Sequence, residues 1–284
     1  MTFYTMTTTE FIKLSLAEDT GPGDYSTLAA IDAGAQGRAV LKVKEKGILA
    51  GMALAEQIVH FLEPEARFDF RKRDGDAVEV GDIAFELDAR VHTILQAERL
   101  LLNCAQRMSG IATLTNQYVS KIKDYKAKVL DTRKTTPLFR KFEKEAVRIG
   151  GGHNHRMGLY DMVMLKDNHI DFCGGIAKAL ERTRAYLQKE NLSLKIEIET
   201  RSLDDVRQVL DAGGADRIML DNYAPAQVAE AVELIAGRAE TEASGGIQLE
   251  NIVSYAQTGV DFISVGAVIH HAVSLDLSLK AQLR

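Results

Sequence analysis

"LKIEIETRSLDDVRQVLDAGGADRIMLDN" (residues 194–222) contains the pattern that decides the fold. Two short apolar, β-branched runs, 194–200 and 216–222, each predict a buried strand that ends in polar side chains. The segment between them, 202–213, shows apolar residues at helical spacing. A strand, a helix and a second strand in this order are typical of a parallel β/α unit.

Four other runs follow the same rule, and each is apolar and finishes in a polar or small group: 127–134, 161–169, 239–246 and 261–267. Helix-like segments occupy 224–237 and 248–259, so the last units repeat every ~22 residues, a length typical of one strand, one helix and their loops. Six strands predict a parallel β/α barrel, either complete or incomplete. A doubly wound open sheet is the alternative. We favour the barrel because polar groups end nearly every strand instead of clustering at one switch point.

The chain before about residue 110 has a different pattern of helix and strand signals. Residues 7–19 show helical spacing after a threonine-rich start, and 92–122 predicts a long helix that is buried on more than one face. Residues 37–51 alternate like strands around a turn, and 73–89 predicts short strands separated by Gly-Asp turns. This part therefore predicts a separate domain of mixed helix and strand.

Composition narrows the class of protein. The 284 residues are 46% hydrophobic and carry a formal net charge of -5, which suits a soluble protein and disfavours general nucleic-acid binding. Two cysteines exclude a disulfide framework and a four-cysteine zinc site. We expect a cytoplasmic protein, because neither a signal peptide nor a run of membrane-spanning length is evident.

The cations gather where the strands end, and many of them lie in "RIGGGHNHRMGLYDMVMLKDNHI" (148–170). The carboxyl ends of barrel strands meet at one face, so these groups should converge there. Solvated surface charge is the alternative. We favour a site for a strongly anionic substrate. The cationic candidates are Arg133, Lys134, His155, Arg156 and Lys166.

Acidic and glycine-rich strand ends complete this predicted site. Glu197 and Glu199 share one face of the strand at 194–200, where they either pair with nearby Lys and Arg or hold a cation or sugar hydroxyls. Asp221 ends the next strand, so Glu199 and Asp221 could converge on one ligand, and their oxygens suit Mg²⁺. The turns "ASGGI" (243–247) and "VGA" (265–267) offer backbone N–H groups that suit a phosphate.

Two other chemistries are open. His153 and His155 could begin a zinc hydrolase site, but beyond His169 only His270 and His271 remain downstream as further histidine ligands. Lys166 could form a Schiff base, as in barrel aldolases. Both are less favoured than the anion site.

Several motifs together resemble the quinolinate phosphoribosyltransferase family. They are "EDTGPGDYST" (18–27), "AERLLLNCAQRMSGIAT" (97–113), "DTRKTTP" (131–137), "AVRIGGGHNHRMGLYDMVMLKDNHI" (146–170), "IMLDN" (218–222), "EASGGI" (242–247) and "GVDFISVGA" (259–267). They cover the chain from about residue 18 to about residue 272, in order.

The resemblance implies a fold and a reaction. It implies an N-terminal α/β sandwich over 1–110, joined by the C-terminal tail 271–284, and an open α/β barrel over 111–270. The implied enzyme uses Mg²⁺ to convert quinolinate and phosphoribosyl pyrophosphate to nicotinate mononucleotide, pyrophosphate and CO₂ in NAD biosynthesis. It implies at least a homodimer, in which Arg99 reaches the quinolinate of the partner. No nucleic acid or membrane is expected as a partner.

The resemblance also assigns residues by motif. It implies that Lys134, Lys166, Glu199 and Asp221 are catalytic and that Glu199 and Asp221 hold the metal. The implied substrate-binding set is Arg99, Thr132, Arg133, Lys134, His155, Arg156, Lys166, Glu199, Asp221, Ser244, Gly245, Gly246, Gly266, Ala267 and His270.

The sequence departs from the family pattern at two positions. Leu138 stands where the resemblance implies glycine, and a positive φ there would strain the loop. His271 stands where it implies serine, as a surface histidine or as an altered, pH-sensitive phosphate contact. A paralogue with another substrate, such as the relative in molybdenum operons, and a catalytically silent sensor or scaffold compete with this interpretation. The intact "DTRKTTP" motif argues against the first, and the retained Lys166, Glu199 and Asp221 argue against the second.

Overall fold

The computed structural model describes residues 6–282 and divides the chain into two compact units. The first unit takes residues 1–114, 136–150 and 272–284, and the second takes 115–135 and 151–271. The outermost residues of the predicted N-terminal domain and tail, 1–5 and 283–284, lie outside the described residues. Among the described residues, no helix has the length and apolar character needed to span a membrane.

The first unit is built on a four-stranded antiparallel sheet. Its strand order is β12 (Leu277–Gln282), β1 (Gln36–Val43), β5 (Ile83–Arg90) and β3 (Arg67–Phe70). The C-terminal strand therefore pairs with the first strand of the chain, with Leu41 opposite Leu279. The strands expected around a turn within 37–51 do form, but β2 (Gly47–Ile48) leaves the β1 sheet and pairs with β4 (Ala77–Val78).

The first unit also contains five helices among its described residues. They are α1 (Thr8–Thr20), α2 (Tyr25–Ala30), α3 (Met52–Leu62), α4 (Val91–Lys121) and α5 (Arg140–Ile149). The last residues of the fourth helix, α4, belong to the second unit. The Thr7 hydroxyl accepts from the backbone N–H of Glu10, whose carboxylate accepts from the N–H of Thr7, so both caps fix the start of α1. The long helix predicted for 92–122 is confirmed as α4. Leu101, Leu102 and Ala105 are all buried, so α4 is covered on more than one face.

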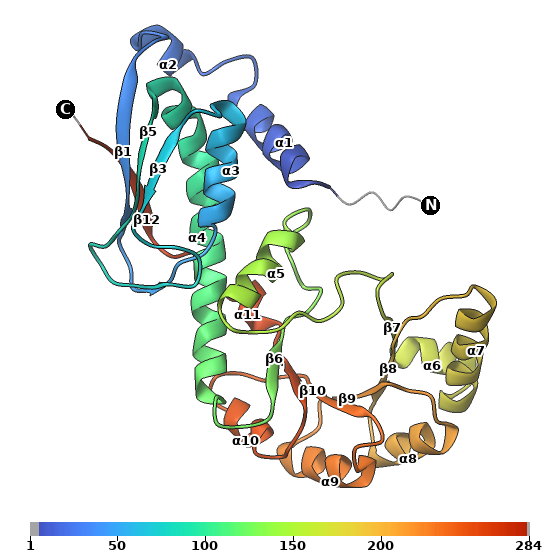
Figure 1. The fold of residues 1–284 in the computed structure, drawn as a ribbon. Helices are drawn as coiled ribbons and strands as arrows, with labels where there is room; N and C mark the ends of the chain where they lie inside the picture. Colours follow the sequence, from blue (N-terminus) through green and yellow to red (C-terminus); the bar gives the residue numbers. More distant parts are fainter. Residues whose placement is uncertain (1–5, 283–284) are drawn as a thin grey trace. The chain divides into compact units, whose positions relative to one another are not determined.

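The second unit is an open parallel barrel, as predicted (Figure 1). Its six strands follow the order β6 (Lys128–Leu130), β11 (Phe262–Ser264), β10 (Glu240–Ser244), β9 (Arg217–Asp221), β8 (Ile196–Thr200) and β7 (Val163–Leu165). All pairs are parallel. Strands β7 to β11 are neighbours in chain order and the sheet returns to β6, whereas a doubly wound sheet would reverse its order.

Helices connect and cover these strands: α6 (Asp167–Cys173), α7 (Ile176–Lys189), α8 (Leu203–Ala212), α9 (Pro225–Ile235), α10 (Ile252–Ala256) and α11 (Ala267–His270). Figure 1 shows α8 and α9 along the outer side of the curved sheet. Every residue of β8 is buried, because helices cover one face and the barrel interior the other. That burial includes two glutamates, which matters for the site.

Candidate active site

The carboxyl ends of the barrel strands present polar side chains at one edge of the sheet. Lys166 follows β7, Glu199 lies in the last part of β8, and Asp221 and Ser244 are the last residues of β9 and β10. Gly266 follows β11, and the segment 132–134 follows β6. We refer to this edge as the barrel mouth. The strand pattern of the sequence placed these groups together because parallel neighbours end side by side.

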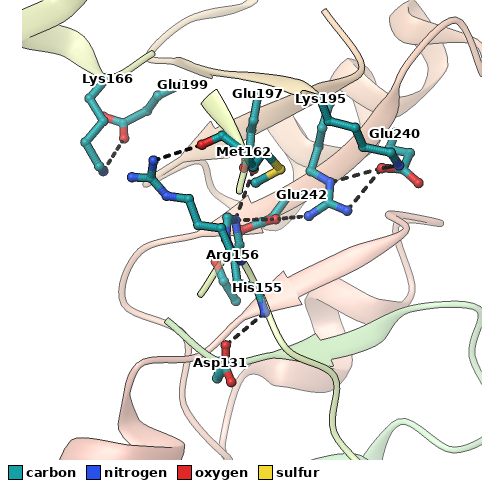
Figure 2. A network of polar contacts seen from close by, with 12 residues as sticks. Asp131, His155, Arg156, Met162, Lys166, Lys195, Glu197, Glu199, Glu240 and Glu242 are labelled. Atoms are coloured by element: carbon teal, nitrogen blue, oxygen red, sulfur yellow. Dashed lines mark hydrogen bonds and ion pairs between the residues drawn. The ribbon is translucent and has the colours of Figure 1, made fainter. Parts of the chain in front are cut away.

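A lysine and two carboxylates form the acidic side of the mouth. The ammonium of Lys166 lies 2.9 Å from a carboxylate oxygen of Glu199 (Figure 2). Lys166 is about half exposed, whereas Glu199 is buried. Burial and the negative charge of Glu199 raise the pKa of Asp221, and Lys166 opposes this rise. The side chain of Asn222 donates to Asp221 over 2.6 Å. The two carboxylates thus repel one another, and the ammonium group of Lys166 offsets part of that repulsion.

Two arginines form the cationic side. Burial and the positive charge of Arg133 lower the pKa of Arg156. Arg156 donates to the carbonyl of Met162 over 3.3 Å (Figure 2). Within residues 6–282, the buried Nε of Arg133 has no hydrogen-bond acceptor. A buried guanidinium nitrogen without an acceptor is costly, and an anion beside both arginines would supply one.

Lys134 and His270 approach the turn after β11. The backbone N–H of Lys134 donates to the Thr132 hydroxyl over 3.1 Å. A Cβ on Gly266 would lie 3.0 Å from Nε2 of His270 and 3.3 Å from Cδ of Lys134. Burial, His271 and Lys134 lower the pKa of His270. The turn is therefore narrow, and cationic or titratable groups face it.

The turn after β10 requires glycine. Gly245 has φ +96°, and a Cβ there would lie 2.9 Å from the backbone nitrogen of Asn222. Gly246 has φ +62° and open space around its Cα. Backbone N–H groups at such a turn can donate hydrogen bonds to a phosphate because no side chain blocks them.

The ring of His155 does not open onto the mouth, because it is buried and Nε2 lies 3.0 Å from Glu197 and 3.5 Å from Glu242. Arg99 is an exposed residue of α4 in the first unit. Leu138 has φ +62°, so the expected strained conformation is present. Neither Glu242 nor Arg217 is among the site residues that the sequence predicts.

The fold and the mouth define a class of protein. An open parallel barrel with cations, paired carboxylates and glycine turns at its strand ends suits an enzyme for phosphorylated, anionic substrates. The N-terminal and C-terminal domain models of quinolinate phosphoribosyl transferase match residues 24–109 and 111–280. The chain therefore belongs to the quinolinate phosphoribosyltransferase family.

Individual relatives agree over nearly the whole chain. The chloroplastic nicotinate-nucleotide pyrophosphorylase [carboxylating] of Arabidopsis thaliana is 46% identical over 95% of this chain and 81% of its own. A probable enzyme of the same name in Bacillus subtilis is 41% identical over 94% of this chain and 90% of its own. The crystal structure of NadC from Streptococcus pyogenes is 41% identical and superposes with a TM-score of 0.90, covering 95% of this chain and 94% of that one.

Proposed function

We propose that this chain transfers the phosphoribosyl group of phosphoribosyl pyrophosphate to quinolinate with decarboxylation. The products are nicotinate mononucleotide, pyrophosphate and CO₂, as in the synthesis of NAD. The names of the relatives support this reaction. The observation that carries it is the pair Arg133 and Arg156. The buried Nε of Arg133 has no acceptor among the described residues, and together with a second guanidinium it suits a dicarboxylate.

The charges of the mouth match the bonds that change. The ring nitrogen of quinolinate bonds to C1 of the ribose, while the C1–oxygen bond breaks and its electron pair leaves with pyrophosphate. Positive charge then develops on the sugar and negative charge on the leaving group. Glu199 and Asp221 stabilise the sugar, and Lys134 and Lys166 stabilise the anions.

Decarboxylation follows from the product of that step. The bond between C2 and its carboxylate breaks, CO₂ leaves, and the electron pair stays beside the cationic ring nitrogen until C2 takes up a proton. Because the ring nitrogen stabilises this electron pair, the protein needs no dedicated base and no covalent nucleophile. The chain contributes positioning and electrostatics.

Mg²⁺ is the proposed cofactor, held by Glu199 and Asp221. Carboxylate oxygens are the ligands that Mg²⁺ prefers, and the charge of Glu199 raises the pKa of Asp221, so a cation there would relieve their repulsion. When bound, Mg²⁺ would neutralise charge on the pyrophosphate.

A homodimer in the cytoplasm completes the proposal. Arg99 is exposed on α4, and we assign it to the quinolinate site of the partner, as the family resemblance implies. Neither nucleic acid nor membrane takes part.

A direct assay tests the reaction. Purified protein is incubated with phosphoribosyl pyrophosphate, Mg²⁺ and either quinolinate or nicotinate, and nicotinate mononucleotide and CO₂ are measured. The proposal predicts that nicotinate mononucleotide forms from quinolinate and not from nicotinate. A folded protein that forms no product, or that prefers nicotinate, would contradict it.

A further inference from the structure

A second layer of charge lies inside the barrel, below the mouth (Figure 2). Glu197 precedes Glu199 by two residues on β8, so both face the barrel interior and Glu197 lies deeper. Glu242 comes from β10, and Arg217 from β9 between them. We call His155, Glu197, Arg217 and Glu242 the inner network.

The inner network is nearly sealed from solvent. Glu197 and Glu242 are both 0% exposed, and the His155 side chain is 5% exposed. Arg217 neutralises part of the charge, with one guanidinium nitrogen 2.9 Å from Glu242 and another 3.0 Å from Glu240. Buried carboxylates are costly unless they are paired, so this arrangement keeps its geometry only when all partners are in place.

The ring of His155 connects this network to the cationic side of the mouth. Its Nε2 faces Glu197 and Glu242, whereas Nδ1 accepts a hydrogen bond of 2.7 Å from the backbone N–H of Arg156. The backbone N–H of His155 itself donates to Asp131 over 2.8 Å. The chain at 155–156 is thus held from the barrel interior and from the end of β6.

The groups around the two ring nitrogens of His155 act on its protonation in opposite directions. Burial lowers the pKa of His155, and Glu197 and Glu242 outweigh that effect and raise it to about 9. A charged ring would carry a hydrogen on Nδ1, where the Arg156 amide hydrogen already points. The amide hydrogen therefore opposes the rise that the carboxylates cause, and it favours the neutral ring with its hydrogen on Nε2, facing the carboxylates.

We propose that Glu197 and Glu242 are positioning residues, which fix Arg156 through the ring of His155 and so aim its guanidinium at a carboxylate of the substrate. This inference rests on the proposed function and deepens it. The family resemblance implies a direct contact between His155 and the substrate, but both ring nitrogens have protein partners here and the side chain is buried.

A metal ion is the competing occupant of the inner network. Ligand atoms of His155, Glu197 and Glu242 lie within 4.8 Å of one another. Arg217 argues against a divalent cation, because its guanidinium already pairs with Glu242 at 2.9 Å and would be repelled in this buried setting.

The first test compares Glu242→Gln and Glu197→Gln with Glu240→Gln. Glu240 also pairs with Arg217, but it contacts neither ring nitrogen of His155, so it is a matched control. The network variants should raise KM for quinolinate by about tenfold and leave KM for phosphoribosyl pyrophosphate within about twofold. Glu240→Gln should change neither. Equal changes in both KM values would contradict positioning, and urea unfolding identifies variants that do not fold.

The second test separates the two ring nitrogens. His155→Asn places a carbonyl oxygen near the position of Nδ1, whereas His155→Gln extends toward Nε2 and loses the acceptor for Arg156. We predict a smaller rise in KM for quinolinate in His155→Asn than in His155→Gln. Equal loss in both would indicate a direct contact of the imidazole with the substrate.

A third measurement does not depend on turnover. Nitrogen NMR of the wild-type His155 ring should show Nδ1 without a hydrogen and Nε2 with one, and Glu242→Gln should shift the Nε2 signal. A hydrogen on Nδ1, or stoichiometric zinc that Glu242→Gln loses, would overturn the inference. Absence of wild-type turnover would contradict the proposed reaction, while this spectrum still tests the anchoring of His155.

Discussion

The ammonium of Lys166 and the carboxylate of Glu199 lie 2.9 Å apart at the ends of the neighbouring strands β7 and β8. Lys166 is about half exposed, so this ion pair contributes little to folding. It holds an ammonium group and a carboxylate at the mouth before any substrate binds. The pair is therefore preorganised for a reaction that separates charge.

Replacement of Lys166 tests that preorganisation. Lys166→Met should lower kcat by about 10²–10³-fold, because a cation that stabilises the anions is lost, and should change the free energy of unfolding by less than about 1 kcal/mol. Lys195→Met is the control, since Lys195 pairs with Glu240 at 3.3 Å and is 59% exposed. Steady-state kinetics and urea unfolding check both values. An equal loss of kcat in the two variants would contradict the role of Lys166.

Leu138 tests the strain that its backbone carries. Its φ is +62° and its side chain is 75% exposed, so Leu138→Gly removes strain without removing packing. We expect the free energy of unfolding to rise by about 0.5–1 kcal/mol after the entropic cost of glycine. Leu159→Gly, at 71% exposure and without a positive φ, should instead lower it by about 0.5–1 kcal/mol. Urea unfolding of both variants measures these free energies. Equal changes in the two variants would contradict the strain at Leu138.

The glycine turn after β10 offers a matched pair. Gly245→Ala would bring a Cβ to 2.9 Å from the Asn222 nitrogen, whereas Gly246→Ala meets open space. Gly245→Ala should raise KM for phosphoribosyl pyrophosphate by about tenfold or more, because the backbone must move where the phosphate binds. Gly246→Ala should have the smaller effect. Initial-rate kinetics test which variant has the larger KM for phosphoribosyl pyrophosphate. A larger KM in Gly246→Ala would show that Gly245 is not at the phosphate.

His270 predicts a pH dependence of stability. Burial, His271 and Lys134 lower its pKa below the ordinary 6.5. Between these two pKa values the unfolded chain binds more protons, so the free energy of unfolding rises with pH in that window. His271→Ser removes the interaction with His271 that lowers the pKa of His270, so this pKa should rise and the window should narrow. NMR titration of the ring measures this, and an unchanged pKa in His271→Ser would contradict the coupling.

The sequence predicted the barrel because its signal is local. Each strand is a buried apolar run with a polar end, and one end of a parallel sheet collects those ends. The positions of Lys166, Glu199 and Asp221 followed from this rule. The pairing of β2 with β4 joins segments that are distant in the chain, and periodicity carries no information on such a pairing.

The direction of the His155 ring is the feature of the inner network that the sequence did not predict. His155 lies in a segment with several cations, so the sequence placed it in the cationic set of the mouth. The direction of the His155 ring depends on Glu197 of β8 and Glu242 of β10, which are distant from it in the sequence. The sequence does contain a sign of these buried charges. Glu240 and Glu242 are two residues apart on β10, as Glu197 and Glu199 are on β8. Two such strands in one barrel require buried cations, and Arg217 on the strand between them supplies one.

The most direct test of the central claim is the stoichiometry of the reaction with quinolinate labelled in its 2-carboxylate. The account predicts one labelled CO₂ and one pyrophosphate for each nicotinate mononucleotide formed. A nucleotide that keeps both carboxylates, or equal turnover of nicotinate without CO₂, would contradict it.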